Sequence, residues 1–104
     1  SPTVIAFIRE NIGFDGLLMI DDLSMKALGG TYESRTEQTL AAGCDLVLHC
    51  NGNMEEMQSV ASASIVLPPL GLARANRAAD MRRAPKPGED AVLLAEWQQL
   101  LAVA

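Results

Sequence analysis

The fold of this chain is decided by residues 13–25, which read GFDGLLMIDDLSM. Within this stretch, residues 17–20 form a short apolar run. The turn-like sequence FDG precedes the run, and Asp21 and Asp22 follow it. A short continuous apolar run between turn residues is typical of a strand that is buried on both faces. The stretch therefore predicts a buried strand with two carboxylates at its carboxyl end.

A second apolar run, residues 46–48 (LVL), follows Asp45 and precedes His49 and Cys50. Between the two runs, the glycine pair at residues 29–30 opens a loop, and residues 33–42 can form a helix that Gly43 closes. Two buried strands joined by a helix favour a right-handed parallel crossover.

Further helices are predicted on both sides of this unit. The first begins with Ser1 as N-cap and Pro2 at the first helical position, and it ends at Gly13. Its apolar residues recur at helical spacing: Val4, Ile5, Ile8 and Ile12. Asn53, with Glu56 three residues later, is a capping-box variant and predicts a helix to about residue 63. After an extended stretch over residues 64–68, we expect helices over 70–83 and 89–103, with residues 84–88 as a stiff turn.

The predicted order is helix, strand, helix, strand and three helices, which is an α/β pattern. Two parallel strands do not make a stable sheet, because parallel sheets need helices on their faces and further strands at their edges. The unpaired edges leave two alternatives. Either the chain is two βα units of a larger α/β structure, or its edges pair with a second chain.

The composition fits a folded chain of at most one domain. Hydrophobic residues make up 49% of the 104 residues and the net charge is −5, which excludes the disordered class. The acidic balance argues against a nucleic-acid partner, and the bases of residues 74–86 are expected to form the solvated face of a helix. No stretch reaches the roughly 20 apolar residues of a membrane span. The first ten residues lack the basic start and apolar run of a signal peptide.

The two cysteines, Cys44 and Cys50, are expected to be buried free thiols. If both lie on or beside one strand, they are roughly 20 Å apart, which is too far for a disulfide. Free thiols suit a reducing compartment, so a cytoplasmic protein is expected. A zinc site is not expected, because His49 and Cys50 are adjacent and would point to opposite faces of a strand.

Asp21 and Asp22 are the strongest candidates for chemistry. Parallel α/β folds place ligand and catalytic groups at the carboxyl ends of their strands. A carboxylate there can act as a nucleophile, as a general acid or base, or as a metal ligand. The alternative is that one or both carboxylates cap the turn that follows.

Four motifs together resemble the bacterial β-N-acetylhexosaminidases of glycoside hydrolase family 3. They are SPTVI at residues 1–5, GFDG at 13–16, DDLSM at 21–25 and AGCDLVLHCN at 42–51. The resemblance covers residues 1 to about 60, in the order of the family. It implies the C-terminal part of a TIM-like (β/α)8 barrel, with residues 1–63 as the last two βα units and residues 64–104 as C-terminal helices.

The resemblance also implies a retaining enzyme that removes terminal N-acetylglucosamine from muropeptides during peptidoglycan recycling, with no metal or organic cofactor. Asp21, the first Asp of the DDLSM motif, would be the nucleophile. Met25 and Asn51 would contact the sugar, with a core methionine and a turn residue as the alternatives. Ile20 departs from the family, which commonly has a small hydroxyl residue at that position.

The acid/base of the family is a His–Asp pair on a mobile loop, and a KHFPGH segment there binds the sugar; neither is present here. The one histidine, His49, stands where the family usually has an apolar residue, and we expect it to be structural or to face the rim. The 104-residue chain alone is therefore expected to be inactive, with the N-terminal part of the barrel as its missing partner. The alternative is a non-catalytic α/β module that self-associates through its strand edges.

Overall fold

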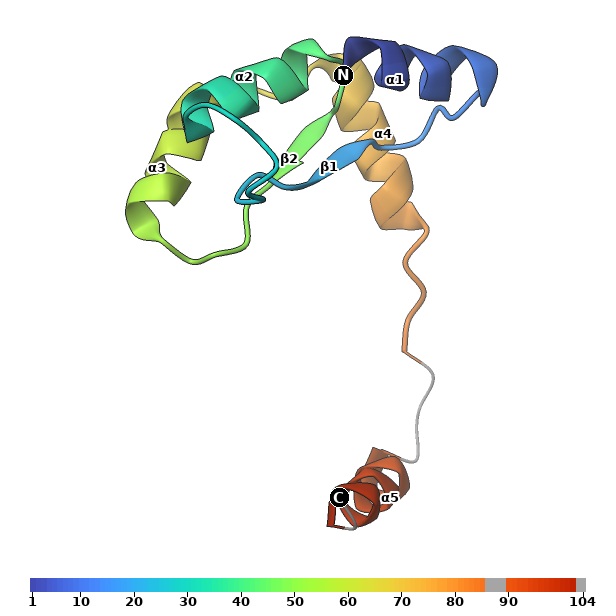
Figure 1. Ribbon diagram of the computed structural model, residues 1–104. Helices are drawn as coiled ribbons and strands as arrows, with labels where there is room; N and C mark the ends of the chain where they lie inside the picture. Colours follow the sequence, from blue (N-terminus) through green and yellow to red (C-terminus); the bar gives the residue numbers. More distant parts are fainter. Residues whose placement is uncertain (86–89, 103–104) are drawn as a thin grey trace.

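The structure is a computed structural model that describes residues 1–85 and 90–102, and two short parallel strands lie at its centre (Figure 1). These are β1 (Met19–Asp22) and β2 (Leu46–Leu48). Met19 lies opposite Leu46 and Asp22 opposite Leu48, with an irregularity between the two pairs. The parallel pairing of the two predicted strands is thus confirmed.

β1 lies two residues later than the apolar run predicts. The strand was expected over residues 17–20, with Asp21 and Asp22 beyond it, whereas both aspartates belong to β1. Backbone pairing with β2, rather than apolar character, sets the bounds of the strand. The pairing even continues past Asp22, because the N–H of Leu23 donates to the carbonyl of Leu48 at 2.8 Å.

The first helix is not a single regular α-helix. The α-helix α1 (Pro2–Ala6) is followed directly by a π-helical segment, η1 (Phe7–Asn11). Ser1 stands at the N-cap, but its side chain makes no capping hydrogen bond; its carbonyl instead accepts the N–H groups of Val4 and Ile5. Gly13 ends the segment with a φ of 74°, as a C-terminal glycine is expected to do.

Helices α2 (Tyr32–Ala41) and α3 (Met54–Ala63) confirm the predicted helices on either side of β2, and they pack against each other. The side chain of Thr31 caps α2 by accepting the N–H of Ser34 at 3.2 Å. Asn53 caps α3, since its Oδ1 accepts the N–H groups of Glu55 and Glu56.

Two more helices follow, α4 (Pro69–Asp80) and α5 (Asp90–Ala102). α4 ends three residues before the predicted limit, with Met81 as its C-cap. Residues 64–68 are without regular structure, as expected. Residues 86–88 of the predicted turn, and the predicted helix ends at 89 and 103, lie outside the described residues. Figure 1 shows α5 apart from the other elements.

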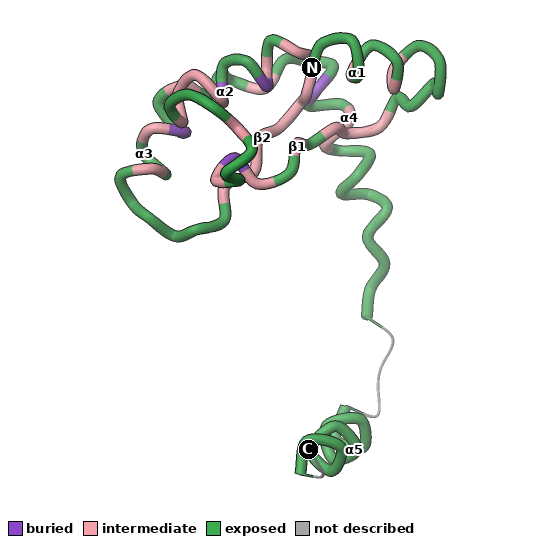
Figure 2. Tube along the Cα trace, viewed as in Figure 1, coloured by how far each residue is buried: buried purple, intermediate pink, exposed green. Residues whose placement is uncertain are grey.

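Few side chains are buried, and the expectation that both strands are buried on both faces is wrong. The residues of β1 alternate between exposed and half-buried, and the three residues of β2 are half-buried. Among the described residues, the buried apolar side chains are Leu23 (0% exposed) and Val60 (8%). Figure 2 shows how few short stretches of the chain are buried. Met19 of β1 is 51% exposed, because no element of the described chain covers that face of the strand. The radius of gyration is 18.7 Å, against about 13 Å for a compact domain of this length.

None of the described helices is long and apolar enough to cross a membrane.

Candidate active site

The adjacent carboxylates at the end of β1 have different surroundings. Asp21 is exposed and Asp22 is half-buried, because successive side chains of a strand point to opposite faces. Among the described residues, the Asp21 carboxylate accepts one hydrogen bond, from the N–H of Asp22 to Oδ1 at 2.8 Å. Its remaining lone pairs are available to a ligand.

Asp22 joins the two loops that follow the strands. Its Oδ1 accepts the N–H of Ser24 at 2.9 Å and the N–H of Cys50 at 3.2 Å, and its Oδ2 accepts the hydroxyl of Ser24. The Ser24 hydroxyl and backbone, together with the Cys50 N–H, hold the pKa of the Asp22 carboxyl below its usual value. An ionised Asp22 therefore ties the loop after β1 to the loop after β2.

His49, directly after β2, fills the space between these loops and α3. Its side chain is 5% exposed, with Nδ1 3.8 Å from Asp22 Oδ1 and Nε2 3.5 Å from Glu56 Oε2. The ring of Tyr32, from α2, meets the imidazole edge to face at a centroid distance of 5.0 Å. His49 is thus a packed side chain in the interior of the chain, rather than one that faces the rim.

Glu56 closes this cluster from the α3 side. The Tyr32 hydroxyl, and after it the Asn51 amide, hold the pKa of the Glu56 carboxyl below its usual value. The same contact raises the pKa of Tyr32. Asp22, His49, Tyr32 and Glu56 therefore bring β1, β2, α2 and α3 together behind the exposed Asp21.

Met25 and Asn51, the predicted sugar contacts, lie in the same two loops. Met25 is 47% exposed, so it is not a core methionine of the described chain. The Asn51 amide donates to Glu56 Oε2, and its Oδ1 accepts the N–H of Asn53 at 2.9 Å, which makes it part of the turn before α3. The structure holds no direct hydrogen bond between either residue and Asp21 within the described chain, and both roles stay predictions.

Arg35, from α2, fixes the loop between β1 and α2. Its Nη1 donates to the carbonyl of Leu23 and its Nη2 to that of Leu28, both at 2.6 Å, and its Nε to that of Gly29 at 3.4 Å. The guanidinium also stacks on the Tyr32 ring at 5.1 Å. Arg35 therefore shapes the segment that carries the DDLSM motif instead of pairing with Asp21.

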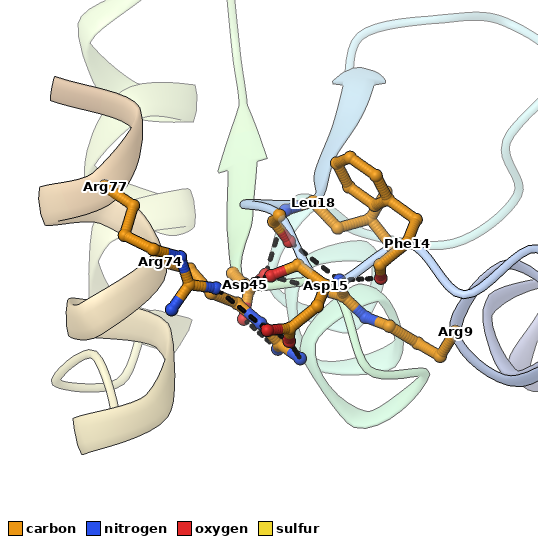
Figure 3. Close-up of polar contacts among 8 residues, drawn as sticks. Arg9, Phe14, Asp15, Leu18, Asp45, Arg74 and Arg77 are labelled. Carbon is orange, nitrogen blue, oxygen red and sulfur yellow. Dashed lines mark hydrogen bonds and ion pairs between the residues drawn. The ribbon is translucent and has the colours of Figure 1, made fainter. Parts of the chain in front are cut away.

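At the opposite, amino-terminal end of the strands, a network of ion pairs holds the elements together (Figure 3). Asp45 Oδ2 accepts from Arg9 at 2.7 Å and from the N–H of Leu18 at 2.9 Å, while its Oδ1 accepts from Arg74 at 3.0 Å. Its side chain is 8% exposed. Asp45 thus links α4, the π-helical segment and the start of the strand pair.

The expectation that the bases of residues 74–86 form a solvated helix face is wrong for Arg74, whose side chain is 12% exposed. Arg74 and Arg77 both pair with Asp15 at 3.0 Å (Figure 3). Because the partners are 59 and 62 positions away, the sequence spacing gave no signal of these contacts.

The cysteine expectations are partly wrong. Both thiols are free, as expected, but Cys44 is half-buried and Cys50 is exposed. Burial raises the pKa of the Cys44 thiol, so it stays in the unreactive protonated form.

Two hollows lie away from Asp21. The larger, of about 380 Å³, runs along the unpaired edge of β1 between α1 and α2 and is lined by Ile5, Ile8, Met19, Ile20 and Leu28, among others. The smaller, of about 230 Å³, lies between the end of α2 and the start of α4. In residues 1–85 and 90–102 no group of three or more His, Cys, Asp or Glu side chains is arranged to hold a metal ion.

The sequence of the chain matches proteins of one known family. The family model described as "Glycosyl hydrolase family 3 N terminal domain" matches residues 1–77. A protein named Beta-hexosaminidase from Chromobacterium violaceum is 40% identical over 98 residues, which are 91% of this chain and 24% of that protein.

Two further proteins of the same name match shorter stretches. The one from Vibrio cholerae is 38% identical over 65 residues, 60% of this chain and 19% of that protein. The one from Mannheimia succiniciproducens is 50% identical over 46 residues, 42% of this chain and 13% of that protein. The chain thus spans 24% or less of the length of these relatives. No solved structure matches it significantly.

Proposed function

The chain belongs to glycosyl hydrolase family 3, and from that membership we propose that it is the C-terminal part of the catalytic barrel of a retaining β-N-acetylhexosaminidase. Residues 1–63 would supply the last two βα units and residues 64–104 the closing helices. The uncovered face of β1 and the two unpaired outer edges of the sheet support this proposal, because a barrel would cover and pair them.

One observation carries the catalytic proposal: Asp21 is an exposed carboxylate at the carboxyl end of a parallel strand, whereas Asp22 beside it accepts hydrogen bonds from both loops. In (β/α)8 enzymes the active site lies at this end of the strands. Asp21 would attack the anomeric carbon, and the glycosidic oxygen would leave with a proton from an acid. Water would then cleave the glycosyl–Asp21 ester, which gives retention of configuration.

The substrate we propose is a saccharide with a terminal N-acetylglucosamine, released from muropeptides in the cytoplasm. The hexosaminide is supported by the name Beta-hexosaminidase that the relatives share. The muropeptide source and the cytoplasm are proposed from the family that the motifs of residues 1–51 resemble. Met25 and Asn51 would contact the sugar from the loops on either side of Asp21. The acid/base and the remaining sugar contacts would come from a part of the barrel outside these 104 residues, so the chain alone would not turn over substrate.

A trapping experiment tests the role of Asp21. The complete protein that carries this chain is incubated with a slow fluorinated N-acetylglucosaminide, digested and examined by mass spectrometry, while NMR follows the anomer released first from an aryl substrate. We expect the sugar on Asp21 and a β-anomer as first product. A label on another carboxylate, or an α-anomer, would contradict the proposed nucleophile or the retaining mechanism.

The exposed apolar side chains favour one second candidate function, self-association of the chain as a non-catalytic module. Large side chains near β1 and α1 that are about half exposed or more include Val4, Phe7, Ile12 and Met19. Sedimentation of the 104-residue chain across a concentration series tests this candidate. A dimer supports it, and a monomer at all concentrations contradicts it.

A further inference from the structure

The single histidine of the chain lies between two carboxylates without a hydrogen bond to either. The His49 side chain is 5% exposed, and in the described part of the chain neither ring nitrogen has a hydrogen-bond partner. Nδ1 faces Asp22 Oδ1 at 3.8 Å and Nε2 faces Glu56 Oε2 at 3.5 Å. Buried polar atoms are nearly always satisfied in folded proteins, so this arrangement calls for a physical account.

Protonation of the His49 ring would account for this arrangement. A neutral imidazole has one N–H donor and one acceptor nitrogen, whereas an ionised carboxylate is acceptor-only. If His49 is neutral, its unprotonated ring nitrogen therefore faces a carboxylate oxygen, and the lone pairs of the two acceptors repel each other. The imidazolium has two donors, one for each carboxylate, and a shortening of the two contacts by less than 1 Å makes both of them charge-assisted hydrogen bonds.

The two carboxylates belong to elements that the site depends on. Asp22 is in β1, accepts from both strand-end loops, and donates its own N–H to Asp21 Oδ1 at 2.8 Å. Glu56 is in the first turn of α3 and accepts from Asn51, the loop residue after β2. A bridge through His49 would therefore fix both loops relative to each other and set the position of Asp21.

We propose that His49 is a positioning residue, which as imidazolium bridges Asp22 of β1 to Glu56 of α3 and thereby holds the Asp21 carboxylate in place. For catalysis this rests on the proposed function of Asp21; the bridge itself does not. His49 would not touch the substrate, since its side chain lies behind the strand ends.

The groups around the ring give the direction of the pH dependence. Asp22 and Glu56 face its nitrogens, Tyr32 of α2 packs on its ring, and Arg35 of α2 stacks on the ring of Tyr32. The pKa of both carboxyls is held below its usual value, by Ser24 in one case and by Tyr32 in the other. They therefore stay ionised at mildly acidic pH, and a bridge through an imidazolium between them is strongest there.

A stability measurement tests the bridge without reference to activity. The complete protein is compared with its His49→Gln variant by denaturant unfolding at about pH 5.5 and about pH 8.5, on either side of the histidine range. We expect the ratio of the unfolding constants of variant and wild type to be roughly tenfold larger at the lower pH. An equal ratio at both pH values would overturn the proposal and leave His49 as a neutral packed ring.

Glu56→Gln provides a second variant, in case the loss of the ring disturbs folding. It removes one charged end of the bridge. The part of the stability change between about pH 5.5 and about pH 8.5 that depends on His49 should therefore fall by about half. Glu55→Gln is the matched control: it makes the same change one residue away on α3, at an exposed carboxylate that, in the described chain, forms no ion pair or hydrogen bond with His49. An identical response of the two glutamate variants would contradict the bridge.

Kinetics test the positioning role. With an aryl N-acetylglucosaminide near pH 6, His49→Gln should lower kcat by about tenfold and change KM less than about twofold, and the loss should shrink as pH rises. If the stability result holds but kcat is unchanged, the bridge exists and the positioning role is wrong. If the wild-type protein cleaves no such substrate, the proposed function fails, and the stability experiment still decides the bridge.

Discussion

The backbone N–H of Asp22 donates to Asp21 Oδ1 at 2.8 Å, so the main chain joins two neighbouring carboxylates whose side chains do different things. Asp22 Oδ1 and Oδ2 accept from Ser24 and Cys50, which uses most of its acceptor capacity. Asp21 keeps most of its own capacity for a ligand. The pair thus combines a carboxylate that holds the two loops with an exposed carboxylate that is free to contact a ligand.

The first prediction concerns Asp21→Ala in the complete protein. Turnover of an aryl N-acetylglucosaminide should fall by about a thousandfold or more, which corresponds to about 4 kcal/mol of lost transition-state stabilisation. Azide should partly restore turnover and yield a glycosyl azide of α configuration, because it attacks from the face that Asp21 occupied. Product analysis by NMR checks this result.

Asp22→Ala is the matched change at the neighbouring position. It should destabilise the loops and lower turnover less than Asp21→Ala, and azide should restore nothing. If Asp22→Ala abolished turnover while Asp21→Ala left it intact, the assignment of the nucleophile would have to be reversed.

The second prediction concerns Asp45→Asn. The carboxylate neutralises Arg9 and Arg74 at a nearly buried position, and loss of one member of such a cluster leaves charge uncompensated. The free energy of unfolding should fall by about 3 kcal/mol, as measured by denaturant titration with circular dichroism. Asp15→Asn is the control, because Asp15 accepts from Arg74 and Arg77 but is 70% exposed, and its loss should matter far less.

Asp45 also gives the third prediction, an acid limit of stability. Although burial acts in the opposite direction, the Leu18 N–H and Arg74 hold the pKa of the Asp45 carboxyl below its usual value. A carboxyl whose pKa is lower in the folded than in the unfolded chain stabilises the protein at pH values above its unfolded pKa, about 3.9. This contribution is lost as the pH falls through the folded pKa. Denaturant unfolding at stepwise lower pH should show that the free energy of unfolding falls below about pH 4, and that it falls less in the Asp45→Asn variant.

The fourth prediction concerns the loop that carries DDLSM. Arg35→Lys keeps the charge but loses the planar fork that reaches the carbonyls of Leu23 and Leu28 at once. Amide hydrogens of residues 23–30 should exchange faster in this variant, as followed by mass spectrometry. Arg83→Lys, at an exposed position, should leave the exchange of these amides unchanged.

The fifth prediction concerns Gly43, which ends α2 with a φ of 104°. An added Cβ would lie 3.1 Å from Ile5 Cγ2, so Gly43→Ala combines backbone strain with a close contact. We expect a loss of about 2 kcal/mol in the free energy of unfolding. Gly52→Ala, with a φ of 73° and open space for its Cβ, isolates the backbone contribution and should cost less. Equal losses would show that Ile5 simply moves aside.

The helices and the second strand could be predicted because their signals are local. Asn53 caps α3 through its own side chain, and Gly43 closes α2 two residues past its end. The strand β1 was displaced because its bounds depend on pairing with β2, a partner 27 positions away, rather than on the apolar run. The π-helical segment was missed because apolar spacing does not distinguish a single wider turn.

The site was predicted unevenly for the same reason. The place of Asp21 at the end of a strand could be predicted from an acidic pair after an apolar run, and its exposure follows from the alternation of side chains along a strand; its role stays a prediction. The cluster around His49 could not, because it joins residues of four elements whose proximity only the folded chain creates. The cation partners of Asp45 were likewise hidden by sequence separations of 36 and 29 residues.

Those separations bear on the order of folding. A contact between distant residues requires closure of a long loop, so we expect the pairs of Asp45 with Arg9 and Arg74 to form after the local helices. Interactions that are absent from the transition state slow unfolding without speeding folding. The ion pairs of Asp45 should therefore slow unfolding and so lengthen the lifetime of the folded state. Asp45→Asn should raise the unfolding rate and leave the folding rate nearly unchanged.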